Sequence, residues 1–143
     1  LFTIPKFDYS LKKQLINPKK VYSIDNGLSS INSASFSEDK GKMLENIVFI
    51  NLRRRYKDIF YFRENGECDF VIKEGTKIKE SIQVCYDLNG DNMEREINGL
   101  IESLEKFNLN KGLILTYEQE DELKIKNKKI KILPVWKWLI NAS

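Results

Sequence analysis

Three strand-like segments in the middle of the chain limit its possible folds most strongly. Residues 59–63, 68–73 and 77–86 are rich in apolar side chains, and short turns containing Gly66 and Gly75 separate them. Connections this short join neighbouring antiparallel strands. The sequence therefore predicts a three-stranded meander.

Patterns typical of helices and buried strands surround the meander. Apolar side chains recur every three or four residues over residues 40–56 and again over residues 91–107, where Asp91 is the expected N-cap. Residues 111–117 and 130–135 are nearly continuous apolar runs, as in strands inside a sheet. With a short final helix, this order predicts a three-layer α/β fold, in which a mixed four- or five-stranded sheet is flanked by the two long helices.

The part of the chain before the first long helix is expected to form an extension. A strand at the start of the chain, a short helix over residues 8–16 and a strand over residues 21–24 precede a loop over residues 25–39 that is rich in Ser, Asn and Gly. We therefore predict an N-terminal extension or linker, residues 1–36, and a folded domain, residues 37–143.

The composition excludes several classes of protein. The chain contains no histidine, which removes Ser-His and Cys-His nucleophiles, and its two cysteines, Cys68 and Cys85, make a poor zinc site. No apolar run approaches the roughly 18 residues of a membrane span and no signal peptide is visible, so a cytoplasmic protein without a membrane partner is expected. The chain opens on Leu1 rather than Met, and we expect further residues upstream.

Two groups of basic residues each allow two interpretations. The net charge of +3 permits DNA binding without requiring it. Residues 53–55, all arginine, lie where a helix is predicted to end, so they suit the helix dipole, although they could also contact phosphate. The lysine-rich residues 124–131 are predicted to form an edge strand that lysine protects from association, with contact to the DNA backbone as the alternative.

Six blocks of residues, in order along the chain, resemble one protein family. They are residues 20–28 (KVYSIDNGL), 41–46 (GKMLEN), 67–71 (ECDFV), 82–88 (IQVCYDL), 95–97 (REI) and 133–139 (LPVWKWL). In these blocks the chain resembles the C-terminal restriction-endonuclease-like domain (PD-(D/E)XK superfamily, DUF4143-type) of prokaryotic AAA+ ATPases. The resemblance implies an upstream ATPase module and winged-helix segment. ATP would bind only there, because this chain has no GxxxxGK[ST] phosphate loop.

The resemblance also implies a magnesium site. Such nucleases supply a glutamate from the first helix, an aspartate from the second meander strand, and a Glu or Gln followed two residues later by Lys from the third, and these hold Mg²⁺, the scissile phosphate and an attacking water. Glu45, Asp69 and Gln83 match the first three positions and are the expected metal ligands and catalytic residues. The fourth position is Cys85, whose thiol is mostly neutral at pH 7 and cannot replace the lysine cation.

This departure leaves more than one interpretation of the site open. Lys73, four residues after Asp69, or Lys42, one helical turn before Glu45, could supply the lysine from elsewhere. Otherwise the site is degenerate and would hold Mg²⁺ weakly. Each ligand also has an ordinary alternative: Glu45 as a solvated helix residue, Asp69 as a buried carboxylate with hydrogen-bond partners, and Gln83 as a hydrogen-bond partner of a nearby turn.

The remaining residues of interest are expected to have structural roles. Glu67 would lie at the rim of the site. Trp136 and Trp138 are expected to pack the final helix onto the sheet rather than to stack on bases. Strand alternation predicts that Cys68 and Cys85 lie on opposite faces of the sheet, so no disulfide is expected.

The sequence thus favours an accessory nuclease-fold domain of an AAA+ ATPase that binds DNA or a protein partner and cleaves little. One alternative is an active Mg²⁺-dependent DNA endonuclease with a relocated lysine. The other is a purely structural docking or oligomerisation domain. In each case the upstream AAA+ module of the same chain is an expected partner.

Overall fold

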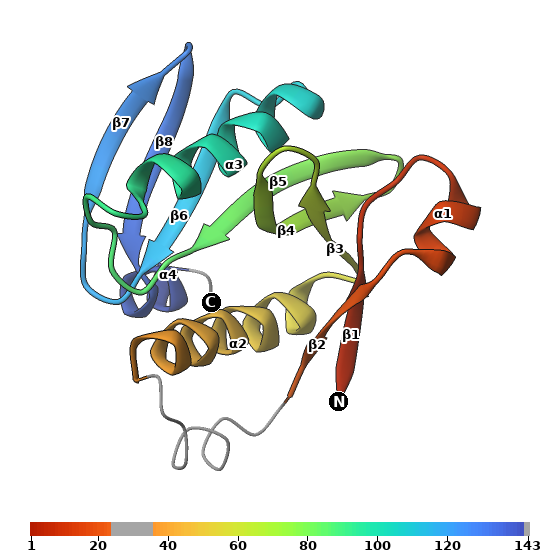
Figure 1. Cartoon of the computed structure of the whole chain (residues 1–143), viewed down its shortest axis with the longest axis horizontal. Helices are drawn as coiled ribbons and strands as arrows, with labels where there is room; N and C mark the ends of the chain where they lie inside the picture. Colours follow the sequence, from red (N-terminus) through yellow and green to blue (C-terminus); the bar gives the residue numbers. More distant parts are fainter. Residues whose placement is uncertain (24–35, 142–143) are drawn as a thin grey trace.

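The architecture is three-layered, as expected from the sequence. The computed structural model describes residues 1–23 and 36–141. A six-stranded sheet with the order β3-β4-β5-β6-β8-β7 forms the middle layer. Helix α2 (Phe36–Arg55) and the short helix α4 (Val135–Asn141) lie on one face of the sheet, and helix α3 (Met93–Lys106) lies on the other (Figure 1).

The sheet combines the predicted meander with a parallel centre. Its strands are β3 (Asp58–Arg63), β4 (Glu67–Glu74), β5 (Lys77–Val84), β6 (Lys111–Thr116), β7 (Asp121–Ile125) and β8 (Lys128–Pro134). Strands β3, β4 and β5 are antiparallel, β6 is parallel to both β5 and β8, and β7 is antiparallel to β8. β5 ends at Val84, so Cys85 and Tyr86, which were predicted to belong to this strand, lie beyond its end.

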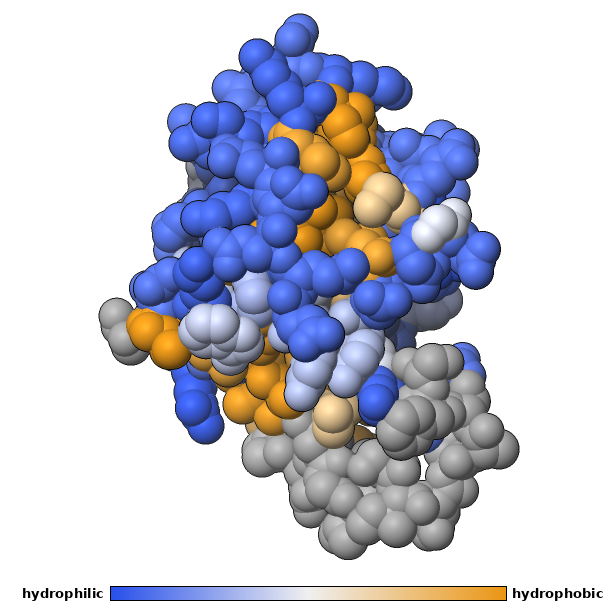
Figure 2. Space-filling view, turned by 90° about the vertical axis from the view of Figure 1, so that its left-hand side faces the viewer, coloured by the Kyte–Doolittle hydropathy of each residue, from blue (hydrophilic) through white to orange (hydrophobic). Residues whose placement is uncertain are grey.

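The sheet has one strand more than the four or five predicted, because the lysine-rich segment forms a hairpin instead of one strand. Lys126 and Asn127 have positive φ angles of 50° and 63°, the conformation that closes a two-residue hairpin. The resulting strand β7 is at the edge of the sheet, as predicted for this lysine-rich segment. Figure 2 shows the side of the molecule on which this edge lies, and hydrophilic side chains cover most of it.

The long helices differ from the prediction mainly where they begin. Helix α2 starts at Phe36, so residues 36–39, predicted as loop, are helical. Glu38 and Asp39 lie in its first turn, where negative charge suits the helix dipole. Helix α3 has Asn92, not Asp91, at its N-cap.

Two apolar clusters, one on each face of the sheet, form the core. The cluster under α2 and α4 includes Val48, Phe49, Phe70 and Trp138, and the cluster under α3 includes Leu100 and Leu104. Trp138 is buried as predicted, but Trp136 is 58% exposed, so the expectation that it packs onto the sheet was wrong. None of the described helices is long and apolar enough to cross a membrane.

The N-terminal segment folds as a two-stranded ribbon that packs against the core. Strands β1 (Phe2–Pro5) and β2 (Lys19–Tyr22) are antiparallel, and helix α1 (Leu11–Ile16), capped by the Ser10 side chain, connects them. Ile4 and Tyr22 belong to the cluster under α2, and the Tyr61 hydroxyl donates to the Pro18 carbonyl at 2.5 Å. Ile24 of the predicted strand and residues 25–35 of the predicted loop lie outside the described residues.

Both thiols lie on the α3 face of the sheet, so the prediction that they lie on opposite faces was wrong. Phe60 pairs with Val71 whereas Phe62 pairs with Cys68, so β4 contains one extra residue between these pairs. Such a bulge resets the alternation of side chains. Cys68 and Cys85 both belong to the cluster under α3, and both are free thiols.

A close approach between α3 and the β3–β4 turn holds the start of β4 in place. A Cβ atom at Gly99 would lie 2.1 Å from the Glu67 carbonyl oxygen, so only glycine fits there. The Glu102 carboxylate also accepts hydrogen bonds from the Gly66 amide and from the Asn65 side chain, both at 3.0 Å. These contacts position the first residues of β4.

We predict that Gly99→Ala lowers the free energy of unfolding by about 1–3 kcal/mol or more, because α3 and β4 must separate to admit one methyl group. The matched control is Gly41→Ala in α2, where a Cβ meets no atom within 4 Å. Gly41→Ala should raise the free energy of unfolding by up to about 1 kcal/mol, because alanine is more stable than glycine inside a helix. Urea denaturation measures both, and equal effects of the two substitutions would contradict the packing described.

Candidate functional site

Three carboxylates surround one ammonium group beside the start of β4. The Lys20 Nζ atom lies 2.6 Å from Glu67 Oε1, 3.1 Å from Asp69 Oδ1 and 4.0 Å from Glu45 Oε2. Lys20 comes from β2, Glu67 and Asp69 from β4, and Glu45 from α2. We refer to these four residues as the lysine–carboxylate cluster.

Asp69 is held in the cluster by β5. Its Oδ2 atom accepts a hydrogen bond from the Val84 amide at 2.8 Å, and its own amide donates to Gln83 Oε1 at 2.9 Å. The Gln83 side chain is buried and also donates to the carbonyls of Glu67 and Glu96. Asp69 and Gln83 therefore lie in contact, as expected. The hydrogen bonds of the Gln83 side-chain amide, however, are structural, because they connect β5 with β4 and α3.

Glu45 is the carboxylate with the most strongly altered acidity. Burial raises its pKa to about 7, the nearby Asp69 charge acts in the same direction, and Lys20 opposes both. The Tyr22 hydroxyl donates to Glu45 Oε2 at 2.6 Å, and burial together with Glu45 raises the pKa of Tyr22. The hydrogen bond from Tyr22 favours the ionised form of Glu45 and so opposes the rise in the pKa of that carboxyl.

Lys20 remains positively charged although it is largely removed from solvent. Burial acts to lower its pKa, but the combined charges of Asp69, Glu45 and Glu67 outweigh burial and raise it. The same ammonium lowers the pKa of Glu67 against the opposing effect of burial. Lys20 is thus an internal counter-ion for the carboxylates.

Of the other residues singled out in the sequence, two lie beside the cluster and one does not. Lys42 and Cys85 line a cleft of about 660 Å³ together with Glu45 and Asp69. Burial, followed by the Glu96 charge, raises the pKa of the Cys85 thiol to about 11. Lys73 lies in a different pocket that contains none of the cluster residues.

Sequence reasoning missed Lys20 and Tyr22, although a signal for them was present. Both lie in the first family-like block, and alternation along β2 directs both side chains to the same face. Glu67, expected only at the rim, contacts Lys20 directly. A second cleft, of about 420 Å³, begins at Asp69 and is lined also by Gln83, Arg95 and Arg63.

The cluster as arranged does not suit Mg²⁺. Magnesium requires several free oxygen ligands in octahedral geometry, but Gln83 Oε1, both Asp69 oxygens and Glu45 Oε2 already accept hydrogen bonds from protein donors. A cation of the protein also lies between the carboxylates. Within the described ranges, no group of three or more His, Cys, Asp or Glu residues has a spacing that could hold a metal ion.

Glu45 gives a testable pH dependence of stability. Its pKa in the folded state, about 7, exceeds the ordinary value of 4.5, so between these values the folded state retains a proton that the unfolded state has lost. The stabilising contribution is complete below about pH 4.5 and is lost as the pH rises through about 7. We predict that Glu45→Gln flattens the decline of unfolding free energy across this window.

Urea midpoints measured at intervals through that pH window provide the test. Glu118→Gln, at an exposed position after β6, is the matched control and should keep the wild-type profile. An identical profile for wild type and Glu45→Gln would show that Glu45 does not titrate in this window.

Comparisons with known proteins agree with the family-like blocks. The model of the family described as "Domain of unknown function (DUF4143)" matches residues 40–138, and this domain is known from the C-terminal regions of AAA ATPases. The chain is 42% identical over 149 residues to the uncharacterized protein MJ1544 of Methanocaldococcus jannaschii; the match covers 96% of this chain and 32% of that protein. The chain thus spans about a third of the length of this relative. No solved structure matches. The chain belongs to the DUF4143 family.

Proposed function

We propose that this chain is an accessory nuclease-fold domain of an AAA+ ATPase, which binds nucleic acid and has little or no cleavage activity of its own. The observation that carries the proposal is the position of Lys20. Its ammonium lies between Glu67 and Asp69, 2.6 and 3.1 Å from their oxygens. There it offsets one unit of the negative charge that would otherwise attract a divalent cation, and it occupies the space between the two carboxylates.

The groups that remain offer little for phosphodiester hydrolysis. Cys85 occupies the position two residues after Gln83, and its raised pKa, about 11 through burial and Glu96, keeps the thiol neutral at pH 7. The adjoining cleft is lined by five acidic and two basic side chains, so it repels a phosphate in the absence of a metal. Electrostatic stabilisation typically contributes factors of about 100 to 1,000 in rate, so its loss removes most activity.

The support for nucleic acid comes from the basic surface elsewhere. Lys124 and Lys129 face each other across the β7–β8 hairpin, and like charges directly opposite each other are destabilising. Glu122, 3.7 Å from Lys129, relieves this repulsion only in part, because both residues are exposed. Facing lysines are tolerated on an edge strand because they discourage pairing with the sheet of another molecule. Phosphates bound along the hairpin would neutralise the charges of these lysines. We assign weak, sequence-independent contacts with duplex DNA to this hairpin.

A second candidate function is an active Mg²⁺-dependent endonuclease. The observation that favours it is also Lys20, because a lysine from β2 lies 3.1 Å from Asp69 Oδ1 and could replace the cation that β5 lacks. In that case Lys20 assists the reaction and its removal abolishes cleavage. In the accessory function Lys20 excludes metal, and its removal increases metal affinity.

One set of variants separates the two functions. A unit charge about 4 Å from another is worth about 4 kcal/mol at an effective dielectric constant of ~20. We therefore predict that Lys20→Met binds Mn²⁺ at least about tenfold more tightly than wild type in calorimetric titration, and that Lys20→Met/Asp69→Asn loses this gain. Lys137→Met, in α4 and paired with Glu120, is the matched control.

Cleavage of supercoiled plasmid with Mg²⁺ completes the test. The wild-type protein should show no cleavage above background, and Cys85→Lys, which restores a lysine two residues after Gln83, should raise it in a manner that depends on Asp69. Robust cleavage by the wild type that disappears in Lys20→Met would establish the second function instead. If no variant binds metal and none binds DNA at low salt, the domain is a docking module for protein.

A further inference from the structure

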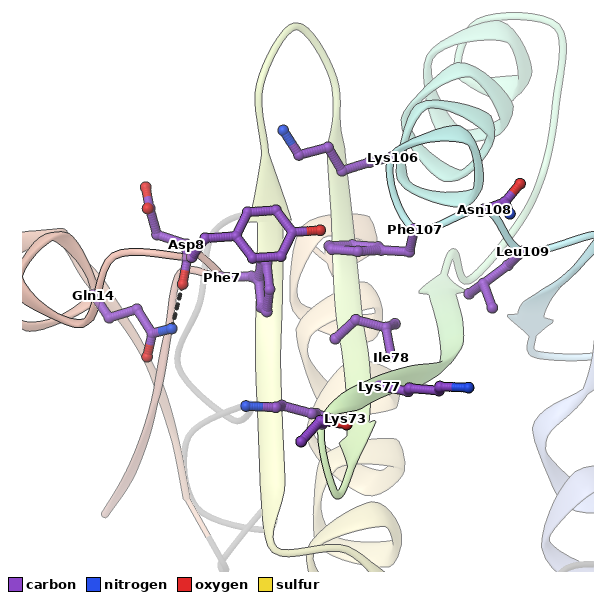
Figure 3. A pocket seen from close by; sticks show the side chains of 12 residues that line it. Phe7, Asp8, Gln14, Lys73, Lys77, Ile78, Lys106, Phe107, Asn108 and Leu109 are labelled. Carbon is purple, nitrogen blue, oxygen red and sulfur yellow. Dashed lines mark hydrogen bonds between the residues drawn. The ribbon is translucent and has the colours of Figure 1, made fainter.

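A groove lined by aromatic rings and lysines lies between the N-terminal segment and the C-terminal end of α3. Its volume is about 610 Å³. Figure 3 shows the rings of Phe7 and Phe107 at its centre, with Lys73, Lys77 and Lys106 around them. None of these side chains belongs to the lysine–carboxylate cluster.

The aromatic rings form a supported platform. The Phe7 ring packs edge-on against Phe107, with centroids 4.9 Å apart, and against Tyr9, with centroids 5.1 Å apart. The Phe7 amide donates to the Tyr61 carbonyl at 2.7 Å, which fixes the segment to β3. Tyr9 itself is 76% exposed, so part of its ring remains open to a ligand. An exposed ring on a fixed base can stack on a nucleic-acid base.

The charge of the groove suits an anion. Three lysines and one aspartate line it, and the carboxylate of that aspartate, Asp8, accepts a hydrogen bond from the Ser10 amide. Lys73 and Lys77 form no ion pair with any carboxylate of the described residues. Lys106 lies 3.1 Å from Glu64 and also 5.9 Å from the centre of the Tyr9 ring. In the sheet Lys73 stands opposite Asp58 and Lys77 opposite Glu74. The groove therefore offers two lysines that form no ion pair among the described residues, beside the aromatic platform.

The groove connects with the lysine–carboxylate cluster through two further hollows. A small hollow of about 90 Å³ shares Tyr9 and Lys106 with the groove and extends to Lys6 and Arg63. Arg63 also lines the cleft of about 420 Å³ that ends at Asp69. Basic side chains outnumber acidic ones in the groove and the small hollow, whereas four acidic and two basic side chains line the cleft at Asp69. A flexible, negatively charged chain is therefore expected to stay in the groove and the small hollow.

We propose that the groove binds single-stranded nucleic acid, with a base stacked on Tyr9 and the adjoining phosphates at Lys73 and Lys77. Base faces are available for stacking on a protein ring only when a strand is unpaired. This assignment rests on the proposed function, because it takes nucleic acid to be the partner of the domain. It adds the class of nucleic acid and a site separate from both the cluster and the β7–β8 hairpin.

The test is fluorescence anisotropy of a labelled oligodeoxythymidine of about ten nucleotides, titrated with the protein at several salt concentrations. Tyr9→Ala should weaken binding by about fivefold or more, because a stacked base contributes at least about 1 kcal/mol. Tyr9→Trp should retain it. Lys73→Ala/Lys77→Ala should reduce the slope of log K against log salt by about 1.4, since each phosphate neutralised on a single strand contributes about 0.7.

The matched control is Lys124→Ala/Lys126→Ala, which removes the same charge from the β7–β8 hairpin. It should leave single-strand binding unchanged and weaken binding of a duplex, whereas the groove variants should do the reverse. The two assignments can therefore fail separately. Equal losses from both lysine pairs would indicate unspecific attraction and overturn the groove site. So would wild-type affinity in Tyr9→Ala, or no single-strand binding at low salt. Capture of an acidic peptide in place of the oligonucleotide would identify a protein-docking groove instead.

Discussion

The packing of the N-terminal ribbon, α2 and β4 against one another depends on the ion pairs of the Lys20 ammonium group. Glu45, Glu67 and Asp69 converge within 4.0 Å of it, where carboxylates partly removed from water would repel one another without a cation. Since the three acids come from α2 and β4 and the lysine from β2, one charge connects the N-terminal ribbon to both the sheet and a covering helix. Tyr22, two residues further along β2, adds a hydrogen bond to Glu45.

The positions of Glu67 and Asp69 are set by contacts of β4 with its neighbours in the sheet and with α3. A bulge in β4 occurs at Asp69, between the pairs Phe60–Val71 and Phe62–Cys68, and bulges commonly redirect a side chain beside a functional site. The contact of Gly99 with the Glu67 carbonyl and the hydrogen bonds of Gln83 hold that strand against α3 and β5. These backbone contacts therefore keep Glu67 and Asp69 at a defined place, where Lys20 supplies the positive charge.

Local patterns in the sequence were enough to predict the layers of the fold, whereas Glu45, Asp69 and Gln83 were singled out by the resemblance to the family. The short turns of the meander and the spacing of apolar residues determine neighbours along the chain, so Asp69, Gln83 and Glu45 were assigned to the correct elements. Lys20 could not be assigned to the site in this way, because β2 pairs with β1 outside the main sheet and its docking depends on distant contacts such as Tyr61 with Pro18. The bulge in β4 and the turn at Lys126 and Asn127 likewise depend on backbone geometry, and they account for the errors over the two thiols and the number of strands.

The most direct test of this account is a double-mutant cycle between Lys20 and Asp69, measured as free energies of unfolding at pH 7. The variants are Lys20→Met, Asp69→Asn and the pair together. A direct ion pair predicts a coupling energy of about 1 kcal/mol or more, because the second substitution costs less once the first partner is absent. Additivity within about 0.5 kcal/mol would show that Lys20 does not neutralise the carboxylates and would contradict the account.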